Sequence, residues 1–415
     1  MGSLKNAQRC PDLVNRAITA SIDDTYLVAH GLHQGARVRT RLIPIVVLAG
    51  CCLVLFACSH ADHANDQPAD APVSHPDTKL PDAPGIDATQ YRYLCDAPIP
   101  SGSPLPTNPN LPAAGCPVLA AGHNDLVSGG NAREFLFVVP ASFSPEEHLP
   151  VLFLWHWIGG SAQSFLDRGE IQAAADEQRF IAVIPVAKGA TVFGLNLNTR
   201  WPFDITQSQA RMDEEFQFFD DMLACVEAQY HINTSCVSTV GVSAGALFTD
   251  QLAQARSNRL ASFISLSGGV NDTIIKPWAG TGAHKLPGIV LWGGDGPPSM
   301  DGNKDILGCL GLGMDFSVAS RDMEQGLVAD GHFFVECRHN CGHVEPPLDT
   351  PPGESKYAAM WEFAMNHPYW LAAGHSPYLD HGLPPAMPAW CAVGQGNSTP
   401  RSGGGCPMAE NPCAF

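Results

Sequence analysis

The sequence predicts an α/β domain with a mostly parallel central sheet and helices on both faces. Between about residues 120 and 370, short apolar runs alternate with segments of helical spacing, which is the pattern of strand–helix–strand units. The run from Pro150 to His156 is continuously apolar, as expected for a strand that is covered on both sides. A small-residue turn at 241–245 joins an apolar strand directly to a helix, as in doubly covered parallel sheets.

The individual elements follow from the period of the apolar residues. Strands are expected where short apolar runs end at turn residues, at 133–140, 150–156, 180–185, 237–242, 261–266, 288–292 and 332–336. Helices are expected at 213–230, 244–255 and 357–365, the first because Phe216, Phe219, Met222, Leu223 and Val226 share one face.

Composition and charge exclude several classes of function. The chain has 415 residues, of which 45% are hydrophobic and 15% charged, and its formal net charge is −18. Nucleic-acid binding needs a basic face that pairs with phosphates, and binding to an anionic membrane surface needs clustered lysine and arginine. Neither partner is therefore expected, and the apolar fraction is too high for a chain that is disordered throughout.

Residues 1–58 are predicted to be an N-terminal extension followed by an export signal of the lipoprotein type. Residues 37–41 are basic and residues 42–57 are apolar and uncharged, as in secretory signals. Cys58 is the first choice for lipidation and Cys51 the second; a plain cleaved signal and an uncleaved anchor are the alternatives. Because such signals normally start near the N-terminus, one hypothesis is that translation begins downstream, near Val38.

The rest of the chain divides into three predicted segments. Residues 59–118 are rich in Pro and Asp and are expected to form an extended linker. Residues 119–372 form the catalytic domain, and 373–415 a Cys-, Pro- and Gly-rich tail. Behind an export signal an even set of cysteines predicts disulfides, with Cys95–Cys116 as the best local pair. The set is Cys95, Cys116, Cys225, Cys236, Cys309, Cys337, Cys341, Cys391, Cys406 and Cys413.

The most informative motif is Gly241-Val242-Ser243-Ala244-Gly245. Between a strand and a helix, this pattern makes a sharp, strained turn that presents a serine hydroxyl at the top of the sheet. Small residues are needed there because strand and helix approach closely. The pattern therefore predicts that Ser243 is a nucleophile.

A serine nucleophile needs a base within hydrogen-bond reach, and in this arrangement the base comes last in the chain. His343 is the first choice and His339 the second, both after the strand predicted at 332–336. The spacing of Cys337, His339, Cys341 and His343 is also compatible with zinc. Because exported cysteines are more often disulfide-bonded, no metal is expected.

The acid that orients the histidine is expected after the strand at 288–292. Asp295 is the first choice, Asp301 the second and Asp305 the third.

The backbone N–H of Ala244, together with that of Trp157 or Ile158, is predicted to form the oxyanion hole, with His156 bracing the loop. Trp157, Trp201 and Phe203 are candidates to line the substrate pocket, and simple packing of the 201–203 segment is the alternative.

These motifs together resemble the polyhydroxybutyrate depolymerases and feruloyl esterases of the α/β-hydrolase fold. The resemblance covers about residues 120–370, from Arg133-Glu134-Phe135 through the 156–160 loop and the Ser243 turn to Gly342-His343. It implies a secreted carboxylic-ester hydrolase with one catalytic domain and a triad of Ser243, Asp295 and His343. The sequence departs from the family at Trp157, at Ala246 and in the acid loop, and it shows no separate polymer-binding module.

The sequence thus predicts an exported serine esterase that forms an acyl-enzyme and needs no cofactor. The expected substrate is a small or polymeric ester, either a hydroxyalkanoate or a feruloyl- or acetyl-type ester. Two other functions stay open: a serine peptidase on the same fold, and a surface lipoprotein that uses the fold as a binding scaffold. The expected location is the cell surface, the periplasm or the medium, with a lipid anchor as the only contact with a membrane.

Overall fold

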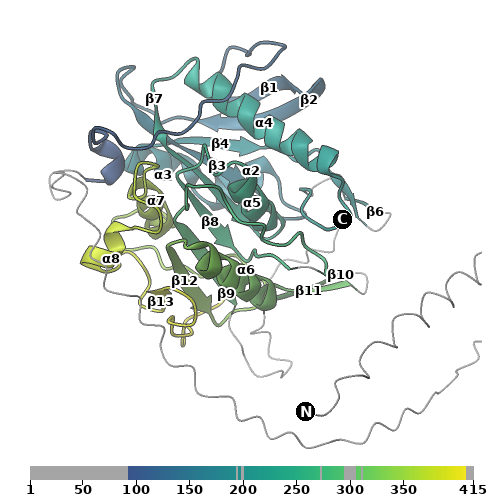
Figure 1. Cartoon of the computed structure of the whole chain (residues 1–415), viewed down its shortest axis with the longest axis vertical. Helices are drawn as coiled ribbons and strands as arrows, with labels where there is room; N and C mark the ends of the chain where they lie inside the picture. The colour runs from purple at the N-terminus through teal and green to yellow at the C-terminus, as the bar shows by residue number, and fades with distance from the viewer. Residues whose placement is uncertain are drawn as a thin grey trace, which may run out of the picture. The chain divides into compact units, whose positions relative to one another are not determined.

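The computed structural model describes residues 92–192, 195–197, 201–271, 273–293, 305–309 and 312–407 (Figure 1). Side chains at 190–192, 195–197, 308–309 and 312–313 are not described. The predicted export signal, with Cys58 and Cys51, lies outside these residues, and so do Asp295 and Asp301. Within the described ranges, no helix has both the length and the apolar character that crossing a membrane requires.

A nine-stranded sheet forms the centre of the folded unit, in the order β1-β2-β4-β3-β7-β8-β9-β12-β13. The strands from β4 to β12 are parallel, whereas β1, β2 and β13 pair antiparallel at the two edges. Two small ribbons, β5–β6 and β10–β11, lie outside the sheet. The bounds are β1 Gly122–Ser128, β2 Asn131–Val138, β3 Leu149–Trp155, β4 Ile181–Pro185, β5 Ala190–Val192, β6 Leu195–Leu197, β7 Ile232–Val242, β8 Ser262–Leu266, β9 Gly288–Gly293, β10 Ile306–Cys309, β11 Leu312–Asp315, β12 Phe334–His339 and β13 Cys391–Val393.

Helices cover both faces of the sheet (Figure 1). Along β3, Val151, Phe153 and Trp155 pack with α4, α5 and α6, while Leu152 and Leu154 pack with α2, α3 and α7. This alternation explains why the whole strand is apolar. The bounds are η2 Leu94–Asp96, α2 Ala162–Arg168, α3 Ile171–Gln178, α4 Gln209–Glu227, α5 Ala244–Ala255, α6 Phe316–Asp330, α7 Ala358–Met365 and α8 Pro377–His381.

The predicted α/β architecture is confirmed, and most predicted elements lie within a few residues of the observed ones. Strand β7 begins five residues earlier than predicted, at Ile232. Ile232 is followed by polar Asn233, Thr234 and Ser235, and the register with β3 shifts between Leu149 and Val151, so no apolar run marks the start. The prediction missed several elements, including β1, α2, α3, α6 and β13, because they are short or carry little apolar periodicity.

In the described part of the chain, four disulfides close the folded unit: Cys95–Cys236, Cys116–Cys225, Cys337–Cys391 and Cys341–Cys406. The predicted pair Cys95–Cys116 is wrong, because each of the two is bonded to the body of the domain instead. The first two bonds tie residues 92–118, the second half of the predicted linker, to β7 and α4. The side chains of Cys309 and Cys413 lie outside the described part. These disulfides fit an oxidising compartment.

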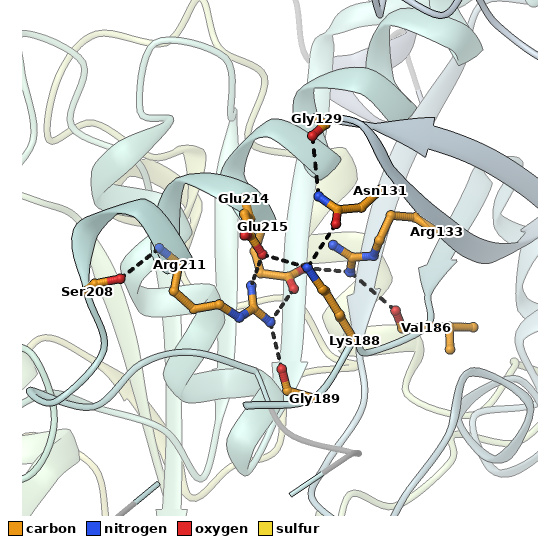
Figure 2. A network of polar contacts seen from close by, with 10 residues as sticks. All are labelled: Gly129, Asn131, Arg133, Val186, Lys188, Gly189, Ser208, Arg211, Glu214 and Glu215. Atoms are coloured by element: carbon orange, nitrogen blue, oxygen red, sulfur yellow. Dashed lines mark hydrogen bonds and ion pairs between the residues drawn. The ribbon is translucent and has the colours of Figure 1, made fainter. Parts of the chain in front are cut away.

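A buried ion network fixes α4 against β2, the strand next to the edge of the sheet (Figure 2). Glu215 is fully buried and receives hydrogen bonds from Arg133 on β2 and Arg211 on α4, each at 2.7 Å. The Arg133 guanidinium also lies over the Phe218 ring, 3.8 Å from its centroid. A buried carboxylate paired in this way is costly to disrupt, because losing one partner leaves an uncompensated charge.

Candidate active site

The serine turn has the strained geometry that its sequence predicts. Ser243 follows β7 and precedes α5, with φ 55° and ψ −119°, a conformation that non-glycine residues rarely adopt. A Cβ on Gly241 would lie 2.2 Å from the Gly245 carbonyl oxygen, and a Cβ on Gly245 would lie 2.0 Å from the Trp155 carbonyl oxygen. Both glycines are therefore required for the close approach of strand and helix.

His343 lies against this serine. Its Nε2 is 2.8 Å from the Ser243 Oγ, although the two residues are 100 positions apart in the sequence. The imidazole stacks on the ring of Phe316, with centroids 4.4 Å apart and planes at 8°. Packing thus fixes one face of the imidazole while its edge meets the serine hydroxyl.

The carboxylate on the other side of His343 belongs to Asp305, the third choice from sequence. Its Oδ1 lies 2.6 Å from His343 Nδ1, and its Oδ2 accepts hydrogen bonds from Ser267 Oγ at 2.7 Å and from the Gly293 amide at 3.0 Å. Asp305 is fully buried. Burial alone would raise its pKa, but the charge and hydrogen bond of His343 bring that pKa below its usual value.

The sequence ranking failed here because Asp305 lies twelve residues beyond the end of β9, whereas Asp295 follows the strand directly. What selects Asp305 is a tertiary contact: the last residue of β9, Gly293, donates its amide to this carboxylate. A Cβ on Gly293 would come within 2.7 Å of the Asp305 Cβ. In the sequence, the glycine pair at 293–294 indicates that another segment approaches the backbone closely, but it does not identify the approaching residue.

His339, the second choice for the base, does not contact Ser243. It is fully buried at the end of β12, and its Nδ1 accepts a hydrogen bond from the Cys341 amide at 3.2 Å. Burial lowers its pKa to about 4. The neighbouring Cys337 and Cys341 are both in disulfides, so they cannot serve as thiolate ligands of zinc. Among the described residues, no group of three or more His, Cys, Asp or Glu side chains could hold a metal ion.

The residues predicted for the oxyanion hole surround the serine. Trp157 and Ile158 line the same pocket as Ser243 and His343, and Ala244 is the buried first residue of α5. His156 is buried, its Nδ1 is 3.0 Å from the Trp157 carbonyl oxygen, and burial lowers its pKa to about 4. The neutral imidazole is hydrogen-bonded to the loop backbone, which is consistent with the bracing role that the sequence suggested.

The pocket in front of Ser243 has an empty volume of about 920 Å³ with its open mouth included. Four aromatic side chains, those of Trp157, Phe165, Tyr357 and Trp361, line it. The other lining residues are mainly aliphatic, including Val240, Val242, Leu266, Pro346 and Met360. Such walls suit an apolar or aromatic group of a substrate.

Trp201 and Phe203 do not line this pocket, so the prediction for them is corrected. Trp201 is fully buried, its indole stands edge-on to Trp155, and its Nε1 donates to the His156 carbonyl oxygen at 2.9 Å. Phe203 is buried in a separate apolar cluster with Leu247. Trp201 therefore supports the 156–158 loop from behind. The lining residues Tyr357 and Trp361 were missed, because α7 is far from the serine motif in sequence.

A carboxylate, that of Glu345, stands in the pocket wall. Its Oε1 accepts hydrogen bonds from Lys356 Nζ at 2.6 Å and from the Tyr357 hydroxyl at 2.5 Å. Burial alone would raise the pKa of Glu345, but these bonds hold it below its usual value, so the group is ionised at neutral pH. Tyr357 itself has φ 62°, a second strained residue at this pocket.

Comparison with known proteins agrees with this picture. No protein-family model matches the chain. Two curated proteins are similar in sequence: a probable feruloyl esterase C of Aspergillus terreus, 26% identical over 163 residues, and feruloyl esterase D of Neurospora crassa, 24% identical over 164. Each alignment covers 38% of this chain and 54% of the relative. The chain thus spans about half the length of the curated relatives it matches.

Similarity to solved structures is more extensive. Native sOPH has a TM-score of 0.54 at 18% identity and covers 71% of this chain and 100% of its own; native pOPH has a TM-score of 0.50 at 19% identity, with 67% and 96% covered. The chain has the α/β-hydrolase fold. The resemblance of this hydrolase-fold protein to feruloyl esterases, predicted from its motifs, is confirmed as a similarity in sequence.

Proposed function

We propose that the protein is a serine carboxylic-ester hydrolase that works through an acyl-enzyme. The observation that carries this proposal is the continuous hydrogen-bonded chain from Ser243 Oγ through His343 to Asp305, at 2.8 and 2.6 Å. Such a chain is the arrangement that activates a serine hydroxyl. The feruloyl esterase names of the sequence relatives support an ester as substrate.

In the proposed reaction, Ser243 Oγ attacks the ester carbonyl carbon while His343 Nε2 takes the hydroxyl proton. Asp305 holds the proton of the imidazole on Nδ1 and stabilises the positive charge that forms. The backbone amides of Ala244 and of Trp157 or Ile158 stabilise the negative oxygen of the tetrahedral intermediate. His343 then protonates the leaving alcohol, and water releases the acid by the reverse sequence.

The pocket favours an aromatic, hydroxylated acyl group of the feruloyl type over acetyl or hydroxyalkanoate groups. Its four aromatic walls match a flat ring, and ionised Glu345 supplies an acceptor for a hydroxyl donor. Both hydrogen bonds that hold this carboxylate go to Oε1. A carboxylate can accept further bonds at its other oxygen.

The test measures hydrolysis of p-nitrophenyl, feruloyl and hydroxybutyrate esters by the wild type and by Ser243→Ala. Loss of the serine should reduce kcat by about 10⁶, and the feruloyl ester should have the highest kcat/KM. Equal turnover by both proteins would refute the role of Ser243. A folded wild type that cleaves amides but no ester would favour the serine peptidase, and one that cleaves neither would favour a binding scaffold.

We further propose that the protein is exported and lipid-anchored at Cys58, with Cys51 as the second choice. The four disulfides support an oxidising location, and the basic and apolar segments before Cys58 support the signal. The mass of the mature N-terminal peptide tests this, since a diacylated cysteine differs from an unmodified terminus by the mass of its lipid.

A further inference from the structure

The loop that carries His343 has no regular secondary structure of its own. Strand β12 ends at His339 and the next helix, α7, begins at Ala358. His343 lies in the bends just after β12, and its ring must stay within hydrogen-bond reach of two groups on other elements. Contacts with other parts of the chain therefore add to the restraint on its first residues.

The C-terminal tail makes that connection. Cys406 is bonded to Cys341, two residues before His343. The side chain of Arg401, itself 9% exposed, donates from Nη1 to Asn340 Oδ1 at 2.9 Å, and Asn340 Nδ2 donates to the Gly403 carbonyl at 3.2 Å.

The same tail is fastened to β12 as well. The Arg401 amide donates to the Arg338 carbonyl at 2.8 Å, and Arg338 Nε donates to Ser398 Oγ at 2.8 Å. A second disulfide, Cys337–Cys391, holds β13 in register beside β12. The Cys337–Cys391 disulfide therefore anchors the tail to β12, and residues 398–406 extend from it to bind the start of the His343 loop.

We infer that this tail clamp, residues 391–406, positions His343 for catalysis, with Arg401 and Cys406 as positioning residues of the proposed esterase. Neither touches the reacting atoms; both act through residues 340–341. The inference rests on the proposed function but concerns a part of the chain that contributes no residue to the triad. It gives the Cys-rich tail a role beyond closing the fold.

The expected size of the effect follows from geometry. A misplacement of a reacting group by about 1 Å can cost about 10²-fold in rate, and His343 Nε2 sits at a normal hydrogen-bond distance of 2.8 Å from the serine. Freeing Cys341 leaves β12 and β13 joined by Cys337–Cys391, so the loop gains freedom while the sheet stays intact. The loss should then appear in kcat rather than in KM.

The experiment compares Cys341→Ser/Cys406→Ser with Cys116→Ser/Cys225→Ser, which removes a disulfide on α4. The first variant should lose about 10- to 100-fold in kcat with KM within about threefold, whereas the second should lose stability but keep kcat. Arg401→Ala, which keeps every disulfide, should also lower kcat, and Arg401→Lys should restore part of it through a cation near Asn340. Unchanged kcat in both the Cys341/Cys406 and the Arg401→Ala variants would overturn the clamp.

A spectroscopic readout separates this inference from the proposed function. The His343 Nδ1 proton, hydrogen-bonded to buried Asp305 at 2.6 Å, should give a low-field proton resonance in the wild type. That signal should weaken or shift in the Cys341→Ser/Cys406→Ser variant and persist in the Cys116→Ser/Cys225→Ser control. If the wild type cleaves no ester, the proposed function fails, and the resonance still decides whether the tail orders His343. A resonance identical in all three proteins would refute the clamp.

Discussion

Replacing Asp305 by Asn tests the assignment of the acid, because the surroundings of Asp305 dictate how the amide must sit. The Gly293 amide can only donate, and it points at the Oδ2 position. In Asp305→Asn, the side-chain carbonyl oxygen would therefore occupy the Oδ2 position and the NH₂ group the Oδ1 position, facing His343. Nδ1 of His343 would then have to accept a hydrogen bond instead of donating one.

This reversal moves the remaining imidazole proton to Nε2, the nitrogen that faces Ser243 Oγ at 2.8 Å. A protonated Nε2 cannot take the serine proton. In chymotrypsin-like serine proteases, the Asp-to-Asn substitution of the triad acid lowers kcat by about 10⁴. We expect a loss of that order here, which corresponds to about 5 kcal/mol in activation free energy. The pocket is untouched, so KM should change little.

The assay is steady-state hydrolysis of a p-nitrophenyl ester at neutral to mildly alkaline pH. Asp295→Asn and Asp301→Asn serve as matched controls, since both residues rank above Asp305 on sequence grounds and carry the same change of charge. Both should stay within about threefold of the wild type, against about 10⁴ for Asp305→Asn. If Asp305→Asn keeps most of the activity, or if Asp295→Asn loses as much, the structural assignment of the acid is wrong.

Three further predictions concern stability and the pocket. Glu215→Ala should destabilise the fold by about 3–5 kcal/mol because it leaves buried Arg133 uncompensated, whereas Glu214→Ala, at a half-buried ion pair with Lys188, should cost less than about 1 kcal/mol; equal melting temperatures would contradict this. Burial raises the pKa of Asp250 from 3.8 to about 8, so the folded state holds its proton more tightly and stability should fall as pH rises from about 4 to 8. Asp250→Asn should flatten this dependence of the unfolding free energy on pH, measured by urea unfolding. An unchanged dependence would contradict the raised pKa of Asp250. Trp201→Phe should cost about 1–3 kcal/mol by leaving the His156 carbonyl unpaired without changing the ranking of ester substrates; a changed ranking would return Trp201 to the pocket.

The serine turn could be predicted because everything it needs is local in the sequence. Gly241 and Gly245 flank Ser243, and the strand before it and the helix after it are both strongly apolar. His343 could be predicted from chain order, since it is the histidine that follows the last parallel strand and precedes a proline pair. α4, with its helical period, and β3, with its continuous apolar run, were predicted for the same reason.

What could not be predicted depends on contacts between distant segments. Three aspartates follow β9, and only the amide of Gly293 and the hydroxyl of Ser267 select Asp305 among them. Cys95 lies closest to Cys116 along the chain, yet its partner is 141 residues away. Trp201 lies in an irregular stretch, where sequence carries no period from which burial could be inferred. In each instance the deciding contact joins residues far apart in the sequence, so the local sequence pattern does not reveal it.

The Cys95–Cys236 disulfide determines where a mechanical load would enter this domain. Asn233 also donates from Nδ2 to the Cys95 carbonyl at 2.8 Å, so the incoming chain is fastened to the beginning of β7, a central strand with β3 and β8 on either side. Cys236 and Ser243 are about seven residues apart along this extended segment, about 23 Å at roughly 3.3 Å per residue. Tension on the N-terminal side would load a strand in shear between two parallel neighbours, at the end opposite the serine. Tension applied through the chain before Cys95 would therefore act on the start of β7 before it acts on the end of β7 that carries Ser243.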